Sequence, residues 1–208
     1  MSDADPSARL RRAPSQKRAL ERVERLLEAA RGLIAEKGSD AMRMAEVAER
    51  AGVSIGSLYQ YFPDKTALIR VLADRFNAES RACIAEELGQ ATDAASLRAA
   101  FRRLVGIYYG LFLAEPVIRD VWSATQADKA LRAFELESSR LNGALLAEAV
   151  SHVKPEVDRA ELEASAFLVM QLGEATMRLA VSVSRAEGDL LVETYLRMAL
   201  AEIAPDDA

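Results

Sequence analysis

The 208-residue sequence predicts an all-α protein of about nine helices, on three observations. Apolar residues recur every three or four positions along nearly the whole chain, which is the period of an amphipathic helix. No segment shows the alternation of β-branched residues that is typical of a strand. Glycine and proline, which interrupt regular structure, are sparse, at 10 and 6 residues.

Charge is distributed unevenly along the chain. The whole sequence carries 27 Lys and Arg against 32 Asp and Glu, a net charge of −5. Residues 1–65 hold 12 basic and 10 acidic residues, whereas residues 66–208 hold 15 basic and 22 acidic residues. A positive end on an acidic body is typical of a nucleic-acid-binding module joined to a separate second module.

The sequence predicts a cytoplasmic protein with no membrane partner. Its longest uncharged apolar run, residues 104–114, is far shorter than the ~20 residues that span a bilayer. The N-terminus is acidic and then basic, with no apolar stretch behind it, which argues against a signal peptide. Cys83 is the only cysteine, so an internal disulfide is excluded.

Residues 1–14 lack helical periodicity and contain Pro6 and Pro14, which predicts a flexible basic arm. The arm carries Arg9, Arg11 and Arg12. One interpretation is a solvated basic tail. The other is an arm that follows the DNA backbone or enters the minor groove. We favour DNA contact through Arg11 and Arg12, because a DNA-binding motif follows closely in the sequence.

Ser15 is predicted to cap a first helix that ends before Gly38, with an apolar stripe of Leu20, Val23, Leu27, Ala30, Leu33 and Ile34. Two short helices follow, over about 44–51 and 54–62. Gly52 lies between them, where the chain needs a left-handed step, and Ser54 is a good N-cap for the second helix. Two short helices around a tight glycine turn predict a helix-turn-helix, whose second helix enters the DNA major groove.

The outer face of that second helix favours DNA over an ordinary buried corner between helices. At about 100° per residue from Leu58, Gly56 and Gln60 point away from the core. Tyr59 and Tyr61, beside an exposed glycine and glutamine, do not suit a buried corner. Lys65 follows in the first turn of the next helix, where a cation beside free N–H groups suits a bound phosphate.

These positions define the predicted DNA contacts. Tyr59, Tyr61 and Lys65 are expected to hold phosphates, whereas Gln60, Ser57 and Ile55 meet base edges and Gly56 permits close approach. The complete predicted set is Arg43, Ser54, Ile55, Gly56, Ser57, Tyr59, Gln60, Tyr61, Lys65, Arg11 and Arg12.

Val47 to Lys65, VAERAGVSIGSLYQYFPDK, resembles the TetR (tetracycline-repressor-like) family of bacterial transcription regulators. The order AGVS, G, LY, YF and K carries the resemblance. It implies a DNA-binding domain over residues 15–63 and a ligand-binding and dimerisation domain over residues 64–208. The family usually has a threonine where this chain has Arg43, and an arginine there can meet a phosphate by charge.

The remaining helices are predicted over about 64–88, 94–114, 116–124, 127–153, 157–185 and 188–203. The last two are apolar on more than one side, which indicates either a thick core or a surface for a second subunit. The resemblance implies the second reading, because family members pair through their last two long helices as a four-helix bundle. The predicted homodimer surface is Leu168, Leu172, Ala175, Leu179, Leu191, Tyr195, Leu196 and Met198.

Several aromatic and polar residues lie within the apolar stripes of the body. Each alone is compatible with simple packing, but together they predict a mostly apolar cavity with a few polar anchors. The resemblance implies a pocket for a small-molecule effector between the fourth and eighth helices. The predicted lining residues are Tyr108, Phe112, Trp122, Phe134, Phe167, Met170, Gln171 and Glu174.

The sequence offers no catalytic constellation. His152 is the only histidine, so a His/Cys metal site or a Cys–His couple is not expected. We therefore expect no enzyme, metal or cofactor. The reading is a homodimeric repressor that a small effector releases from a palindromic double-stranded DNA operator. The alternative is a helical small-molecule-binding or scaffold protein that does not bind DNA.

Overall fold

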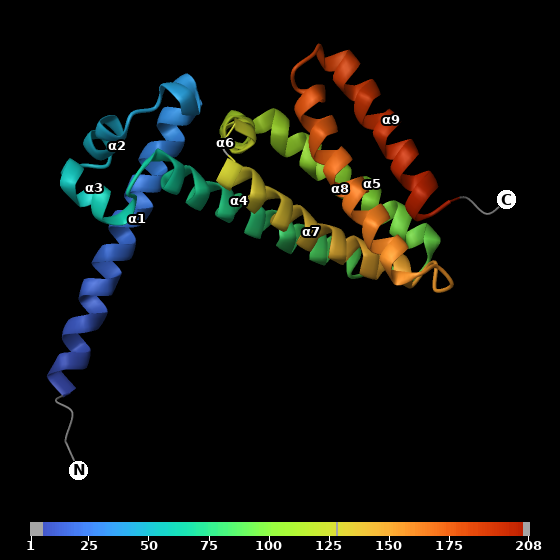
Figure 1. Ribbon diagram of the computed structural model, residues 1–208, viewed down its shortest axis with the longest axis horizontal. Coiled ribbons are helices and arrows are strands. Elements are labelled where there is room, and N and C mark those ends of the chain that lie inside the picture. Colours follow the sequence, from blue (N-terminus) through green and yellow to red (C-terminus); the bar gives the residue numbers. More distant parts are fainter. Residues whose placement is uncertain (1–5, 128, 206–208) are drawn as a thin grey trace. The chain divides into compact units, whose positions relative to one another are not determined.

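The computed structural model describes residues 6–127 and 129–205, apart from the side chains of residues 6–16, 116, 123–127 and 130. The described residues form nine α-helices and no strand, so the prediction of an all-α fold is confirmed (Figure 1). No helix among them is both long and apolar enough to cross a bilayer. The helices are α1 (Pro6–Ala41), α2 (Met44–Arg50), α3 (Ile55–Tyr61), α4 (Lys65–Leu88), α5 (Ala94–Ala114), α6 (Pro116–Ala127), α7 (Lys129–Ser151), α8 (Arg159–Ala180) and α9 (Arg185–Ile203).

The chain divides into two compact units between Leu72 and Ala73, inside α4. The expected boundary between residues 63 and 64 therefore differs from the structural one. Leu68, Ile69 and Leu72 are buried in the first turns of α4 and belong to the N-terminal unit, which we call the head. We call the unit from Ala73 onward the body.

The head is built from α1, α2, α3 and the start of α4. Gly38 breaks the helical backbone of α1 with a φ of 81°, which explains why the periodic pattern stops there. Gly52 has a φ of 66° in the turn between α2 and α3, as expected for a position that favours glycine. The core of the head includes Leu26, Leu27, Ala30, Leu33, Ile34, Met42, Val47, Ala48, Leu58, Phe62, Leu68, Ile69 and Leu72.

The start of α1 differs from the expectation. The helix begins at Pro6, so residues 6–14 are helical where the sequence predicted an arm. Proline is tolerated in the first turn of a helix, and the Ala, Arg and Leu residues that follow are good helix formers. Leu20 was expected in the buried stripe but is 64% exposed, because the core of the head begins further along α1, at Leu26.

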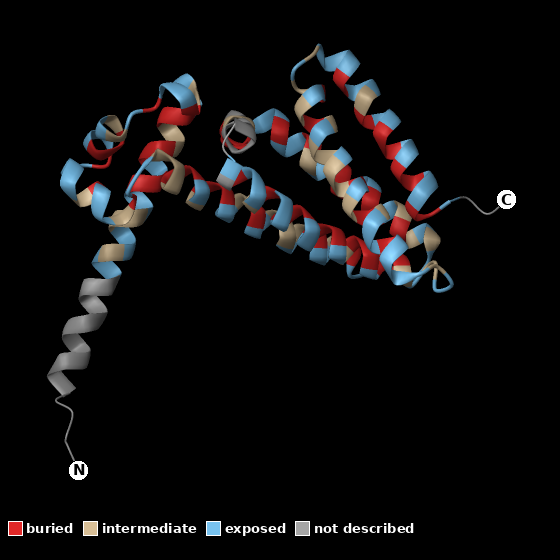
Figure 2. Cartoon of the chain, in the orientation of Figure 1, coloured by how far each residue is buried: buried red, intermediate tan, exposed pale blue. Residues whose placement is uncertain are grey.

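In the body, α7 packs along α8, and α8 packs along α9. α5 contacts α6, α8 and α9. Figure 2 shows the buried residues of these helices as rows that alternate with exposed ones. Helix starts are fixed by local caps: Ser96 N–H donates to Asp93 Oδ1 over 2.8 Å at α5, and Glu187 N–H donates to Ser184 Oγ over 3.3 Å at α9.

The expected eighth helix, over about 157–185, extends too far. α8 ends at Ala180, and the Val181 N–H donates to the carbonyl of Met177. Ser184, which the prediction included in that helix, caps α9 instead. Serine is favoured at a helix start but is also tolerated inside a helix. Periodicity alone therefore did not separate the two helices.

Gly188 of α9 offers a test of the packing between α8 and α9. A Cβ there would lie 2.3 Å from the Ala180 carbonyl oxygen and 2.8 Å from Tyr109 Oη. We expect Gly188→Ala to lower the free energy of unfolding by about 2 kcal/mol or more, since backbone must move to make room. Urea denaturation at fixed protein concentration measures the change.

Gly106→Ala is the matched control. A Cβ at Gly106 meets nothing within 4 Å, so the substitution is expected to raise stability by roughly 0.5–1 kcal/mol through helix propensity. If Gly188→Ala is as stable as Gly106→Ala, the close approach of α9 to the end of α8 is wrong.

Candidate functional site

The reading helix α3 is only seven residues long and is held by its ends and one buried side chain. Ser57 N–H donates to Ser54 Oγ over 3.2 Å, which confirms Ser54 as the N-cap. Leu58 is fully buried, and Phe62 is buried directly after the helix ends. α3 is therefore fastened on one side and leaves the opposite side uncovered.

That uncovered side carries most of the predicted base-reading residues. Ile55, Gly56, Tyr59 and Gln60 are all exposed, and Ser54 is exposed at the helix start. Tyr61 is half-buried at the end of the helix. The structure thus presents Ile55, Gly56, Tyr59 and Gln60 together on one surface.

Gly56 and Ser57 behave differently from each other. A Cβ at Gly56 would meet nothing within 4 Å, so the packing of this chain does not require a glycine there. A surface glycine that weakens a helix without an internal reason suits close approach by an external partner. Ser57 Oγ, in contrast, is shielded from solvent and has no hydrogen-bond partner among the described residues, so it does not lie on the reading surface as predicted.

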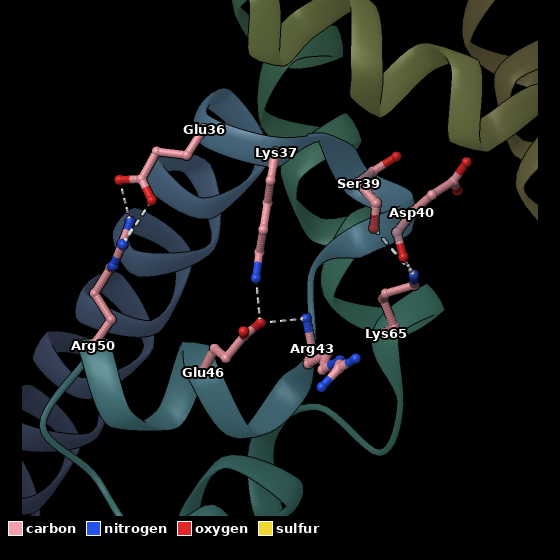
Figure 3. Close-up of polar contacts among 8 residues, drawn as sticks. All are labelled: Glu36, Lys37, Ser39, Asp40, Arg43, Glu46, Arg50 and Lys65. Atoms are coloured by element: carbon pink, nitrogen blue, oxygen red, sulfur yellow. Dashed lines mark hydrogen bonds and ion pairs between the residues drawn. The ribbon is translucent and has the colours of Figure 1, made fainter.

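Arg43 is the exposed N-cap of α2, at the position predicted from the motif. The arginine side chain has no hydrogen-bond acceptor, so it cannot cap the helix by accepting from a backbone N–H as a threonine hydroxyl would. Its backbone N–H instead donates to Glu46 Oε2 over 3.1 Å, and Lys37 Nζ of α1 donates to the same oxygen over 2.5 Å (Figure 3). The bond from Lys37 holds the pKa of Glu46 below its ordinary value. These contacts leave the guanidinium group of Arg43 exposed at the start of α2.

A second ion pair joins α1 to the other end of α2. Arg50 donates from both terminal nitrogens to Glu36, with distances of 2.7 and 2.8 Å (Figure 3). This two-bond geometry lowers the pKa of Glu36 through the hydrogen bond from Arg50. α2 is therefore clamped to α1 at both of its ends. These contacts join charged residues 9 and 14 positions apart, a spacing that does not predict a pair from the sequence.

Lys65 has a structural role that the sequence did not predict. Its Nζ donates to the carbonyl oxygens of Ser39 and Asp40, both over 3.0 Å (Figure 3). These carbonyls lie in the last turn of α1, beyond the break at Gly38. An ammonium group has three N–H donors, so one remains for a phosphate. Asp64 caps α4, accepting from the Ala67 N–H over 2.7 Å.

Arg11 and Arg12 complete the predicted DNA contacts. Both belong to α1, but their side chains lie outside the part of the chain that the structure describes.

The body contains a cavity of about 30 Å³ between α5, α7, α8 and α9. Three predicted lining residues, Tyr108, Met170 and Glu174, do meet there. The complete lining is Phe101, Leu104, Val105, Tyr108, Asn142, Met170, Gly173, Glu174, Met177 and Tyr195.

The other predicted pocket residues do not line this cavity. Phe112 and Trp122 pack edge to face with ring centroids 5.0 Å apart, and Phe167 lies under the guanidinium group of Arg140. Phe134 and Gln171 are half-buried elsewhere on α7 and α8. These residues were misplaced because an apolar stripe shows that one side of a helix is buried, but it does not reveal which neighbouring helix that side faces.

Asn142 is the most informative residue that the sequence analysis missed. It is 4% exposed, and its Oδ1 has no hydrogen-bond partner among the described residues. A signal was available, since Glu135, Ser138, Ser139 and Asn142 recur at helical spacing and are all buried on α7. Such a buried polar row needs partners, and this one faces the cavity and α8.

Glu174 has the most strongly perturbed carboxyl group of the site. Burial raises its pKa to about 7, and the negative charge of Glu135 adds to the rise. Ser139 Oγ donates to Glu174 Oε1 over 3.1 Å, while Arg178 Nη1 lies 3.7 Å from Glu135 Oε1. The pKa of Tyr108 is also raised, first by burial and then by Glu174. Near neutral pH the site therefore holds an acid that is about half ionised.

The outward side of α8 and α9 carries exposed apolar residues. Leu168, Leu172, Leu179 and Met198 are 57%, 44%, 51% and 61% exposed. Ala175 is exposed and Leu191 is half-buried. The prediction was wrong for two of the dimer residues, Tyr195 and Leu196. They are 7% and 5% exposed within one chain, because they fill the core between α9 and its neighbours.

Two family models match the chain. The model described as "Tetracyclin repressor-like, C-terminal domain" matches residues 95–206, which is more than half of the chain. The model described as "Bacterial regulatory proteins, tetR family" matches residues 26–72, which include α2, α3 and the start of α4. The second match ends where the structure divides the chain.

Individual relatives resemble the two parts to different extents. The HTH-type transcriptional repressor KstR of Rhodococcus jostii is 46% identical over 57 residues, which cover 27% of this chain and 27% of the relative. A solved TetR-family transcriptional regulator from Streptomyces coelicolor is 22% identical, with a TM-score of 0.67 over 91% of this chain and 99% of that chain. The transcriptional regulator FadR from Bacillus subtilis, solved in complex with stearoyl-CoA, is 17% identical, with a TM-score of 0.62 over 88% of this chain and 99% of that chain. At these identities the two solved structures show a shared fold.

Lys65 provides a test of the head. We expect Lys65→Met to lower the free energy of unfolding by about 1.5–3 kcal/mol, because two backbone carbonyls of α1 lose a charged donor. Lys17→Met is the matched control, since Lys17 is largely exposed and pairs only weakly with Glu21. Urea denaturation of both variants decides the matter, and equal stability would show that the bonds to Ser39 and Asp40 contribute nothing.

Proposed function

Because the chain belongs to the TetR family of bacterial transcription regulators, we propose that it is a homodimeric repressor released from a palindromic operator by a small effector. The family consists of transcription regulators rather than enzymes. Membership gives the class of protein. The dimer, the operator and the release step are argued below from the residues of this chain.

The uncovered side of α3 is the observation that supports DNA reading. A helix with Leu58 fully buried presents Ile55, Tyr59 and Gln60 to solvent. Glutamine pairs with adenine in the major groove, an apolar side chain meets the thymine methyl group, and a tyrosine hydroxyl reaches phosphate. Arg43 and Lys65 flank this surface with positive charge at the starts of α2 and α4.

The exposed apolar residues of α8 and α9 support a dimer. Leu168, Leu172 and Leu179 recur at spacings of four and seven along α8, and Met198 lies on the adjacent α9. Apolar side chains gathered on one side of two neighbouring helices favour an interaction surface over a solvated one. A two-fold pairing of this surface presents two copies of α3, which requires an operator with matching symmetry.

The effector is placed in the cavity of the body. Apolar walls with a few buried polar groups are typical of a small-molecule site. α4 begins in the head and ends in the body, so a change in the body that moves α4 also moves its first turn. Thermodynamic reciprocity then requires that DNA weaken effector binding by the same factor as effector weakens DNA binding.

Selection of binding sites from random duplexes tests the proposed function directly. The wild-type protein is expected to select an inverted repeat whose half-sites lie about 34–36 Å apart, or a multiple of that distance. Gln60→Ala is expected to relax sequence preference at one position per half-site, where a good contact contributes about 1–3 kcal/mol. Tyr59→Phe is the control, because loss of a phosphate contact weakens all sequences alike.

Two outcomes contradict these assignments. If Gln60→Ala weakens specific and non-specific binding equally, Gln60 does not read a base. If the wild-type protein selects no duplex at all, the alternative of a helical protein without DNA binding stands.

The dimer surface is tested by charge. We expect Leu172→Glu with Met198→Glu to weaken dimerisation at least a hundredfold, about 2.7 kcal/mol, because two carboxylates lose water at the interface. Leu141→Glu is the matched control, since Leu141 is comparably exposed but belongs to α7 rather than to α8 or α9. Sedimentation measures the dimer fraction, and a double variant that remains dimeric removes α8 and α9 from the interface.

A further inference from the structure

The cavity of the body presents hydrogen-bond acceptors to whatever occupies it. Asn142 Oδ1 is buried and has no partner among the described residues. Glu174 accepts one bond from Ser139 at Oε1, which leaves the capacity of its second oxygen. The Tyr195 hydroxyl donates its proton to the carbonyl of Val169 over 2.9 Å, so toward the cavity it can only accept. These three groups call for donors on the ligand, while the Tyr108 hydroxyl in the same lining can either donate or accept.

The charge around the cavity favours a positive ligand. Two carboxyl groups, Glu174 and Glu135, lie close enough for the charge of Glu135 to raise the pKa of Glu174, after burial as the first cause. Two cations lie nearby: Arg178 is 3.7 Å from Glu135, and Arg81 of α4 donates to Ser138 Oγ and opposes the rise in the pKa of Tyr108. The tyrosines Tyr108 and Tyr195 contribute no positive charge. A ligand cation beside Glu174 removes the repulsion between the carboxylates, whereas a ligand carboxylate or phosphate increases it.

The walls of the cavity favour an apolar body on that ligand. Phe101 and Tyr195 place their ring centroids 6.4 Å apart, and aromatic faces attract cations as well as apolar groups. Met170 and Met177 form part of the wall, and methionine adapts its shape to different contents. Gly173 is required for this shape, because a Cβ there would lie 2.8 Å from Tyr195 Oη.

We propose that the effector is an apolar amine whose protonated nitrogen binds between Glu174 and Asn142. This inference rests on the proposed function, which places the effector in the body, and adds the chemical class of that effector. About 30 Å³ of space is enough for a group the size of one water molecule, such as an ammonium group. The remaining apolar part then displaces the flexible side chains of Met170 and Met177.

Glu174 gives the proposal a distinctive pH dependence. Its pKa of about 7 in the unoccupied site means that a proton competes with a ligand cation for the carboxylate. The ionised fraction falls about tenfold between pH 8 and pH 6 for such a group. An alkylamine stays protonated over this range, because its pKa resembles that of lysine, about 10.4. Amine affinity is therefore expected to be highest above pH 7 and to fall as the pH drops.

Three probes of equal length separate the charge types: hexylamine, 1-hexanol and hexanoate. Isothermal titration calorimetry on the full-length protein measures their affinities at about pH 8 and pH 6. We expect hexylamine to bind most tightly and hexanoate most weakly. The affinity of hexylamine is expected to fall about tenfold from pH 8 to pH 6, whereas that of 1-hexanol stays unchanged.

Variants then locate the charge. Glu174→Gln keeps the size of the side chain but removes its charge, so hexylamine affinity at pH 8 is expected to fall at least tenfold and its pH dependence to disappear. Retained binding of 1-hexanol shows that the cavity is intact in this variant. Glu163→Gln is the matched control on the same helix, since Glu163 is exposed and pairs with Arg159 outside the cavity.

The outcomes are distinct for the amine site and for the proposed repressor. Hexanoate binding as tightly as hexylamine, or no loss in Glu174→Gln, overturns the amine site. If stearoyl-CoA releases the operator while hexylamine does not bind, the amine site is wrong and the effector-released repressor stands. If hexylamine binds as expected but operator affinity does not change, the amine site stands and the release step fails.

Discussion

The exposed surface of α3 that carries Ile55, Tyr59 and Gln60 depends on the packing of Leu58 in the core of the head. Helices shorter than about 12 residues are marginal in water, so the seven residues of α3 need tertiary packing to remain helical. Leu58 supplies that packing, and Phe62 adds to it just after the helix. Because both lie on one side, the opposite side stays open for DNA. The same contact that stabilises α3 thus fixes which residues it presents.

The glycine turn and the polar ties of the head serve the same end. Gly52 adopts a φ of 66°, which lets α3 follow α2 with a tight change of direction. Arg50 with Glu36, and Lys37 with Glu46, join the two ends of α2 to α1. Exposed ion pairs contribute only about 0–1 kcal/mol each, so their role is orientation more than stability. The bonds of Lys65 to two backbone carbonyls, of which the one to Ser39 is part-buried, fix the first turn of α4 to the end of α1.

Local signals in the sequence predicted the elements better than the site. Gly38, Gly52, Ser54, Asp64 and Asp93 each mark a helix end by their own backbone or side-chain chemistry, so the helix boundaries nearby were found. The outer face of α3 was also predictable, because one short helix with one buried leucine has only one inner side.

The cavity and the dimer surface depend on facts that one sequence does not contain. α8 and α9 are apolar on two sides, and periodicity gives no way to tell which side meets the core. Tyr195 and Leu196 were assigned outward and lie inward, whereas Leu168 and Met198 are exposed. Asn142 was overlooked, because a polar residue inside an apolar helix is recognised as unpaired only when its neighbours are known. Lys65 was likewise predicted to bind only a phosphate, because its carbonyl partners are 25 and 26 residues away in the sequence and could not be foreseen.

Release of DNA requires more than a ligand that fits. A ligand shifts an equilibrium only by the difference in its affinity for the two states, so a cavity that accepts it without change transmits nothing. The cavity of the body holds about 30 Å³, so any ligand larger than an ammonium group must push the cavity walls apart. The C-terminal half of α4 is tied to the body, where Arg81 donates to Ser138 Oγ and Arg103 pairs with Glu87. Its first turn is tied to the head through Lys65. In the proposed mechanism, an effector that enlarges the body acts on a helix that is anchored at both ends. About 1.4 kcal/mol of such strain is enough for a tenfold loss of operator affinity.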